Sequence, residues 1–195
     1  MIRKFTFLSI LIFALASCST ETVFKEVKVN NRYSITIPDY LQPCADLHKD
    51  ASFQYQNTDK DIYALVIDER KKTMENYDLD YDIDLYFNSI VKTPFQEMIK
   101  DGKVSPPGRQ EIDGHKALIA DITGNIEGRA VYYRMAVIET PFAFYQILVW
   151  TRADNKEKYF NDMVKMIESF KELPQPDSEL PDKKLSDSVT ITTPY

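Results

Sequence analysis

Two groups of residues have types and spacing that could do chemistry, an acidic run and a cysteine–histidine pair. In the acidic run, Asp78, Asp80 and Asp82 alternate with apolar residues, and the pattern continues to Asp84. Carboxylate oxygens at close spacing are typical ligands of Ca²⁺. An EF-hand loop beginning at Asp78 would need Gly at its sixth position and Glu at its twelfth, and this chain has neither there. Asp78, Asp80 and Asp82 are therefore candidate calcium ligands outside that motif. The alternative is a loop that leads into the acidic first turn of a helix.

The cysteine–histidine pair is Cys44 and His48, which stand four residues apart. On a helix this spacing could hold a metal ion, but two ligands do not complete a zinc site. The alternatives are a small buried thiol beside a surface histidine, or a nucleophilic thiol. The chain has no phosphate-binding loop and no Gly-x-Ser-x-Gly motif. We therefore expect no catalytic residues, no metal site and no cofactor, and the protein is predicted not to be an enzyme.

The N-terminus has the pattern of a secretory leader. Met1–Lys4 is basic, and the apolar run Phe5–Ala16 is shorter than the about 20 residues that span a bilayer. The run ends in Leu15-Ala-Ser-Cys18, which resembles a bacterial lipobox. We expect residues 1–17 to be a lipoprotein signal peptide and Cys18 to carry the lipid anchor. The alternative is an ordinary signal peptide with an incidental cysteine.

The tether behind the anchor is short. Residues 18–22 precede the first strand pattern, and the four residues Ser19–Thr22 reach roughly 13–14 Å when extended. The folded domain should therefore lie close to a membrane, attached through the lipid on Cys18. Ser19 stands where a retention aspartate is found in inner-membrane lipoproteins, and no acidic run follows Cys18. We expect a cell-envelope location on the periplasmic face of the outer membrane.

Composition narrows the function classes. The chain has 195 residues, 44% of them hydrophobic, which predicts one globular domain. Its formal charge of −6 argues against a nucleic-acid partner, because such proteins need a basic surface. We expect residues 23–173 to form the domain and residues 174–195 to form a flexible tail, in which Ser188–Thr192 could add to a sheet edge.

The elements that must position the candidate residues are clearest in the second half of the chain. Three runs have the residue types of β-strands: Ala117–Thr123, Ala130–Ile138 and Phe142–Thr151. Gly124–Gly128 and Glu139–Pro141 separate them and are typical of hairpin turns. Apolar residues then recur at helical spacing from Tyr159 to Phe170. The pattern predicts an antiparallel meander followed by an amphipathic helix.

The first half predicts four more strands and one more helix. The strands are expected at Val23–Val29, Tyr33–Ile37, Ala51–Gln56 and Asp61–Glu69, and the polar run Arg70–Asp80 is expected to be a loop. A helix should begin near Asp82. Pro94 ends or kinks that helix, or opens a second one with Thr93 as its N-cap. Both faces of the strand Ala130–Ile138 are apolar, so both faces of the sheet must be covered. The fold class is therefore α+β, with an antiparallel sheet of about six to seven strands between two main helices.

The order of these elements resembles the PsbP-like fold. The resemblance rests on a hairpin that ends in Ser34-Ile-Thr-Ile-Pro38, the long meander with Tyr145-Gln-Ile-Leu, and a C-terminal helix that ends in Ser169-Phe-Lys171. It covers residues 23–171, and it departs from the family at Tyr40, where many members carry Gly-Trp after the proline. The family includes a photosystem II subunit, bacterial DcrB-type lipoproteins and chaperones of secreted effectors. The resemblance implies a non-enzymatic binding or assembly role.

These observations predict a lipid-anchored envelope protein that binds another envelope protein as an accessory factor, an assembly factor or a chaperone. The first alternative is a lipoprotein that binds a small ligand in a pocket between the sheet and the helices. The second alternative is an envelope hydrolase. Six aromatic residues bear on the ligand alternative, and we expect them to form core and cross-strand pairs rather than a ligand cage: Tyr132, Tyr133, Phe142, Phe144, Tyr145 and Trp150.

Overall fold

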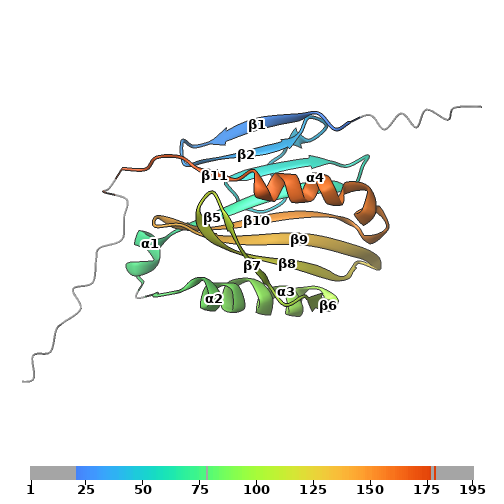
Figure 1. The fold of residues 1–195 in the computed structure, drawn as a ribbon. Coiled ribbons are helices and arrows are strands. Elements are labelled where there is room, and N and C mark those ends of the chain that lie inside the picture. Colours follow the sequence, from blue (N-terminus) through green and yellow to red (C-terminus); the bar gives the residue numbers. More distant parts are fainter. Residues whose placement is uncertain (1–20, 78, 177, 179–195) are drawn as a thin grey trace, which may run out of the picture.

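A large antiparallel β-sheet forms the centre of the computed structural model, which describes residues 21–77, 79–176 and 178 (Figure 1). Neighbouring strands follow the order β3-β4-β5-β10-β9-β8-β6, and β7 also pairs with β8. The strands are β3 (Gln42–Pro43), β4 (Phe53–Asn57), β5 (Ile62–Arg70), β6 (Lys100–Val104), β7 (Gly108–Ile112), β8 (His115–Ile126), β9 (Arg129–Glu139) and β10 (Ala143–Arg152). The predicted meander is therefore β8, β9 and β10, and it forms the middle of the sheet.

The N-terminal hairpin forms a second, smaller sheet. Its order is β1-β2-β11, with β1 (Phe24–Val29), β2 (Tyr33–Pro38) and the short C-terminal strand β11 (Lys171–Glu172). Asn30 and Asn31 form the hairpin turn with φ values of 48° and 54°, a conformation that asparagine tolerates better than most residues. The predicted hairpin is confirmed, and it lies beside the main sheet rather than within it.

Helices cover both faces of the main sheet (Figure 1). The long amphipathic helix α4 (Lys156–Glu168) follows a 3₁₀ turn η2 (Ala153–Asn155) and packs between the small sheet and β9–β10. The opposite face carries α2 (Ile83–Tyr86), a π-helical segment η1 (Phe87–Lys92) and α3 (Thr93–Met98). A short helix α1 (Lys71–Glu75) follows β5 directly, so the predicted loop begins later than expected. The α+β class with helices on both faces is confirmed.

Strand β9 divides the core because its side chains alternate between two buried clusters. Tyr132, Ala136 and Ile138 pack with the small sheet and α4. Tyr133, Met135 and Val137 pack with α2, η1 and α3. Each face buries large aromatic side chains, and such side chains contribute strongly to the stability of a core because each buries a large apolar area. The prediction that both faces of this strand are buried is therefore confirmed.

The helical segment around Pro94 matches the alternative in which Pro94 opens a second helix, because α3 begins at Thr93 and Pro94 lies in its first turn. Helical backbone angles run from α2 through Phe87, Lys92 and Thr93, so the chain does not break there. A proline cannot donate the usual backbone hydrogen bond, and the π-helical turns just before it accommodate that loss. Thr93 as an N-cap is wrong, because its hydroxyl donates to the carbonyl of Asn88 at 3.0 Å.

The turn between β8 and β9 lies further along the chain than predicted. Strand β8 continues to Ile126, and the turn consists of Glu127 and Gly128, with φ values of 50° and 81°. Gly124 is within the strand, where a Cβ atom would lie 2.3 Å from Cγ2 of Ile99. The prediction of a turn at Gly124 was wrong because that glycine allows close packing against the segment before β6 rather than a reversal of the chain.

Candidate functional site

Cys18 and the other residues up to 20 lie outside the described residues, so the leader and the anchor stay predictions. The same holds for residues 179–195, which include the predicted strand Ser188–Thr192. Within the part of the chain that the structure describes, no helix has both the length and the apolar character needed to cross a membrane.

Cys44 and His48 do not form the helical pair that could share a metal ion. Both lie in the irregular segment between β3 and β4, where His48 is exposed and its Nδ1 accepts from the backbone of Asp50 at 3.2 Å. Burial raises the pKa of the Cys44 thiol, and the charge of Asp46 raises it further. A raised pKa reduces the thiolate fraction, so the environment does not activate Cys44 as a nucleophile.

The acidic run is divided among different local contacts. Asp78 lies outside the described residues. The side chain of Asp82 caps α2 by accepting from the backbone N–H of Leu85 at 2.7 Å, and Asp84 pairs with Arg109. Within residues 21–77, 79–176 and 178, no group of three or more His, Cys, Asp or Glu side chains is arranged to hold a metal ion. Asp82 and Asp84 therefore form the acidic start of α2, and Asp80 precedes that helix.

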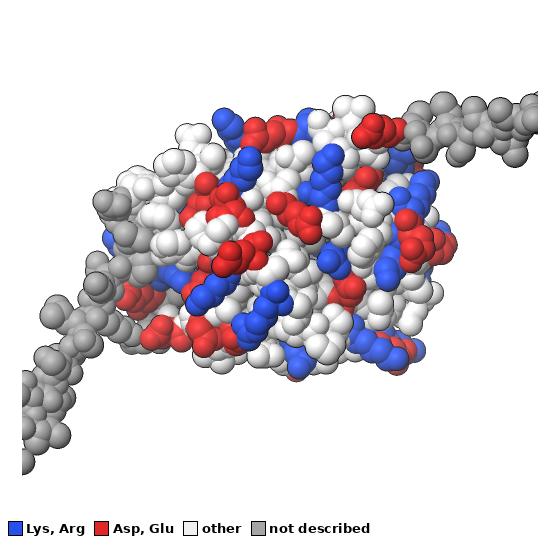
Figure 2. Space-filling view, viewed as in Figure 1, with Lys and Arg blue, Asp and Glu red and all other residues white. Residues whose placement is uncertain are grey.

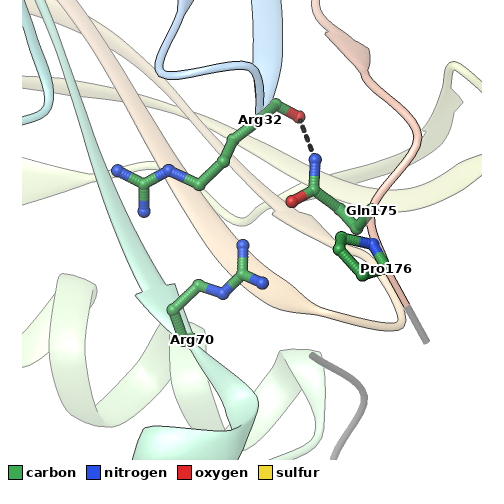
Figure 3. Close-up of a pocket in the computed structure, with 4 residues that line it drawn as sticks. All are labelled: Arg32, Arg70, Gln175 and Pro176. Carbon is green, nitrogen blue, oxygen red and sulfur yellow. Dashed lines mark hydrogen bonds between the residues drawn. The ribbon is translucent and has the colours of Figure 1, made fainter. Parts of the chain in front are cut away.

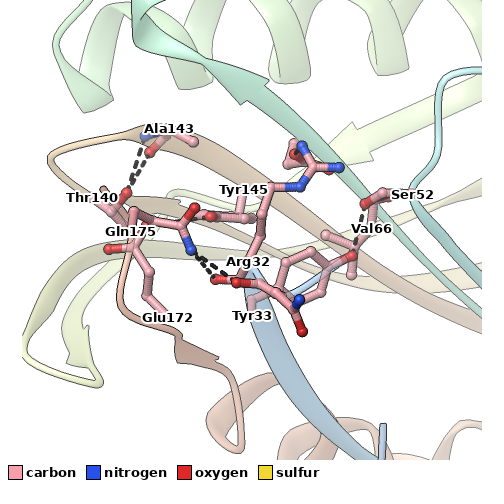
Figure 4. A network of polar contacts seen from close by, with 11 residues as sticks. Arg32, Tyr33, Ser52, Val66, Thr140, Ala143, Tyr145, Glu172 and Gln175 are labelled. Carbon is pink, nitrogen blue, oxygen red and sulfur yellow. Dashed lines mark hydrogen bonds and ion pairs between the residues drawn. The ribbon is translucent and has the colours of Figure 1, made fainter. Parts of the chain in front are cut away.

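A polar cluster at one end of the main sheet brings together residues that are distant in sequence (Figure 4). Arg32, just after the β1–β2 turn, forms an ion pair with Asp68 near the end of β5. The side chain of Asp68 is only 3% exposed. Next to this pair, the hydroxyls of Tyr33 and Ser52 lie 2.7 Å apart. Strand register sets the arrangement, because β5 and β10 place Asp68 opposite Tyr145.

Arg32 and Arg70 line a cavity of about 260 Å³ at this end of the sheet (Figure 3). Gln175 and Pro176, just beyond β11, complete its lining. The Gln175 side-chain amide donates to the backbone carbonyl of Arg32 at 3.2 Å. We call this the Arg32–Arg70 cavity. Its walls supply guanidinium donors from two separate segments of the chain, whereas the two amide N–H groups of Gln175 are directed at the backbone carbonyls of Asn31, Arg32 and Leu173.

A second cavity of about 270 Å³ is lined in part by the turn between β9 and β10. Its lining includes His115, Lys116 and Lys71, and the Nζ of Lys71 is 2.7 Å from Oε1 of Glu139. Nε2 of His115 lies 3.6 Å from Oε2 of Glu172. Thr140 supplies a hydroxyl among the described residues that line this cavity, and its Oγ1 donates to the carbonyl of Ala143 at 3.1 Å and accepts from the backbone N–H groups of Phe142 and Ala143. A histidine therefore stands beside a carboxylate, but this hydroxyl is engaged in the turn between β9 and β10 rather than paired with the histidine as a hydrolytic triad requires.

Tyr145 in β10 is hydrogen-bonded to the C-terminal strand β11 through Glu172. Its hydroxyl donates to Oε1 of Glu172 at 3.2 Å. Burial raises the pKa of Tyr145 well above its usual value, and the negative charges of Glu172 and Asp68 raise it further. The phenol therefore stays protonated at neutral pH. It serves as a hydrogen-bond donor that fixes the C-terminal segment to the sheet.

A different kind of surface lies on the α2–α3 side of the sheet. Leu85 is 48% exposed, Met98 is 68% exposed, and Ile126 at the end of β8 is 37% exposed. Ile126 lies near Met98 because β6, which begins two residues after Met98, pairs with the end of β8. We call these three side chains the helix face. The small sheet and α4 lie on the opposite side of the main sheet (Figure 1).

Neither the Arg32–Arg70 cavity nor the helix face was predicted from the sequence. The one available signal was Asp68, because it continues the inward-facing series Ala64 and Val66 of β5. A charged residue on a buried strand face requires a partner of opposite charge. The aromatic residues predicted to form core and cross-strand pairs do so where they are buried. Phe144 stacks on Tyr86 at 4.2 Å between ring centroids, and Trp150 stacks between Tyr63 and Tyr133.

Comparisons with known proteins identify the fold. No family model matches the chain, and no curated protein matches its sequence. The chain is similar to the solution structure of a cyanobacterial PsbP, CyanoP from Synechocystis, with a TM-score of 0.54 and 13% identity over 81% of this chain and 98% of that one. It is also similar to LpqN, involved in cell envelope biogenesis of Mycobacterium tuberculosis, with a TM-score of 0.54 and 11% identity over 79% of this chain and 92% of that one.

A third solved structure, from Bacteroides thetaiotaomicron, has a TM-score of 0.52 and 11% identity over 80% of this chain and 50% of that chain. At these identities the likeness concerns the fold alone. The chain has a PsbP-like fold, as the order of its elements predicted.

Proposed function

We propose that this chain is a lipid-anchored envelope protein without catalytic activity, and that it binds a protein partner through the helix face. One observation carries the proposal: apolar side chains are exposed on the side of the sheet that lies away from the N-terminal strand. Single exposed apolar side chains are common on protein surfaces, whereas a contiguous apolar patch marks a site that binds other proteins, and the proposal is that the helix face forms part of such a patch.

The proposed anchor determines which end of the domain lies near the bilayer. If Cys18 carries lipid, four tether residues lead to Thr22, and β1 begins at Phe24. The end of the domain at which β1 begins then lies next to the membrane, with Thr22 within roughly 13–14 Å of the anchor. The helix face lies on the opposite side of the main sheet from β1. It is therefore open to a partner in the surrounding compartment.

The energetics of the helix face are sufficient for a specific contact. Burying the exposed part of a Leu or Met side chain contributes about 1–2 kcal/mol to binding, since full burial is worth about 1.5–3 kcal/mol. Acidic and basic side chains are interspersed on the face of the molecule that Figure 2 displays. Such a surface does not favour a polyanionic partner.

The fold adds support by analogy. LpqN, which has the same fold, is described as involved in cell envelope biogenesis, and an envelope location for this chain accords with its lipobox pattern. The small-ligand alternative, with a pocket lined by aromatic residues, is less favoured, because Tyr132, Phe144 and Tyr145 are buried in the core.

In-cell crosslinking followed by affinity purification tests the proposal. The full chain is compared with Leu85→Glu on the helix face and with Val23→Glu, a matched apolar-to-acidic change at a residue that is 64% exposed on the other side. We expect one dominant envelope protein to be recovered with the wild type and with Val23→Glu, and to be lost with Leu85→Glu. Equal recovery with both variants would exclude the helix face. A Cys18→Ser chain that still fractionates with membranes and incorporates fatty acid would exclude the anchor.

A further inference from the structure

We propose that the Arg32–Arg70 cavity binds a small oxyanion, a carboxylate or phosphate group carried by a soluble ligand. The cavity of about 260 Å³ has room for such a group with a short organic stem, because liquid water occupies about 30 Å³ per molecule. This site is separate from the helix face, whereas the choice of a soluble ligand over a lipid headgroup rests on the proposed anchor.

The lining supplies the donors that an oxyanion requires. The guanidinium groups of Arg32 and Arg70 enter from the β1–β2 hairpin and from the end of β5 (Figure 3). Gln175 lies beside them, and its amide N–H groups donate to backbone carbonyls of the protein rather than to the cavity. Each planar guanidinium carries five N–H donors and matches carboxylate and phosphate oxygens in pairs. Arg70 already takes part in another interaction within the protein. With five donors, it can keep that contact and still face the cavity.

Arg32 is held in position before any ligand arrives. Its backbone N–H donates to Val29 at 2.8 Å, and its carbonyl accepts from Leu173 at 2.8 Å. Its guanidinium is paired with the buried Asp68, and the Arg32 side chain is only 28% exposed. An arginine fixed in this way loses little conformational freedom when it binds an anion, so less of the binding free energy is lost.

The acidic groups around the cavity already have partners. Asp68 is paired with Arg32, and Glu172 accepts from Tyr145 and lies beside His115. Arg70 reaches the same cluster, since its charge lowers the pKa of Tyr145 against the larger effect of burial. An incoming oxyanion would therefore meet guanidinium donors at the cavity wall, with the carboxylates turned toward other groups.

The position of the cavity favours a soluble ligand over a lipid headgroup. Arg32 follows the hairpin turn, and the six residues of β1 separate that turn from the end of the domain where the tether enters. A strand of this length spans about 20 Å. The cavity thus lies at the end of β1 that is remote from the proposed anchor.

Isotope-edited NMR on the chain from Ser19 to Tyr195, which contains every described residue, tests the site. Inorganic phosphate and acetate are titrated while the Arg Nε–H signals and the Gln175 amide signals are followed. We expect saturable shifts at Arg32, Arg70 and Gln175. Arg70→Gln should weaken binding about tenfold, the effect of losing one charge-assisted hydrogen bond. Arg109→Gln, at an arginine whose side chain is 66% exposed, is the matched control and should bind like the wild type.

Two outcomes would overturn the proposal: no saturable shift at these three residues, or equal weakening by Arg109→Gln. Should Arg70→Gln fail to fold, Arg70→Lys keeps the charge but loses the planar fork, and it should weaken binding by a smaller factor. Vesicles containing phosphatidylglycerol identify the source of the anion. Binding that depends on Arg70 and is displaced by phosphate would assign a lipid headgroup to the same site. Absence of vesicle binding, together with the phosphate shifts, would assign a soluble ligand.

Discussion

Removing Arg32 should destabilise the fold far more than removing an exposed arginine. Arg32→Gln leaves the Asp68 carboxylate, which is 3% exposed, without its cation. Breaking a buried ion pair from one side costs about 3–5 kcal/mol. Because the Arg32 side chain is 28% exposed, water reaches the pair in part, and we expect a loss of about 3 kcal/mol in the free energy of unfolding.

A double-mutant cycle isolates the ion pair from other effects of the substitution. In Arg32→Gln combined with Asp68→Asn, no buried charge is left unpaired, so the double variant should lose less stability than the sum of the single variants. We expect a coupling of about 1–3 kcal/mol for residues in direct contact. Arg109→Gln breaks the exposed pair with Asp84 and should cost less than about 1 kcal/mol.

Urea denaturation followed by fluorescence measures each variant, because Trp150 is the only tryptophan and stacks, partly buried, between Tyr63 and Tyr133 against the core. The reasoning fails if Arg32→Gln unfolds within about 0.5 kcal/mol of the wild type, the usual effect of a surface substitution. It also fails if the effects of the two single substitutions simply add. Either result would mean that Asp68 is solvated rather than held by Arg32.

Three further predictions concern stability. Gly124→Ala should cost about 1–3 kcal/mol by overpacking against Ile99, whereas Gly108→Ala, with its nearest neighbour at 3.8 Å, should be nearly neutral; equal melting temperatures would contradict this. Burial raises the pKa of the Tyr133 hydroxyl to about 12, so the native state holds this proton more tightly than the unfolded chain does. The stability that comes from this difference should be lost as pH rises from about 10 to 12. Tyr133→Phe should reduce that alkaline loss in urea titrations, and an unchanged pH profile would refute the cause. Asp82→Ala should cost about 1 kcal/mol by removing the cap of α2, and adding calcium should not restore the lost stability.

The sequence predicted the centre of the sheet because the signal there is local. Strands β8, β9 and β10 carry dense runs of apolar residues. In β9 the side chains on both faces of the strand are apolar, which indicates that both faces are buried. The edge strands β6 and β7 were missed because most of their side chains are polar and exposed. Their strand conformation comes from backbone pairing with β8, which no local pattern of apolar residues records.

The cavity could not be predicted for a related reason. Arg32 and Asp68 are 36 positions apart, and Tyr145 and Glu172 are 27 apart, so only the strand register brings them together. The candidates that stood out in the sequence had short spacings, such as Cys44 and His48. Short spacing carries meaning only on a regular element, and that segment has an irregular backbone.

The most direct test of the proposed function is site-specific photo-crosslinking in the native membrane. A photoreactive residue is placed at position 85 on the helix face or at position 23 beside the tether. We predict that position 85 captures one discrete protein, and that position 23 captures phospholipid, because the two positions lie on opposite sides of the main sheet. A protein adduct at position 23 with none at position 85 would contradict both the partner surface and the orientation of the domain.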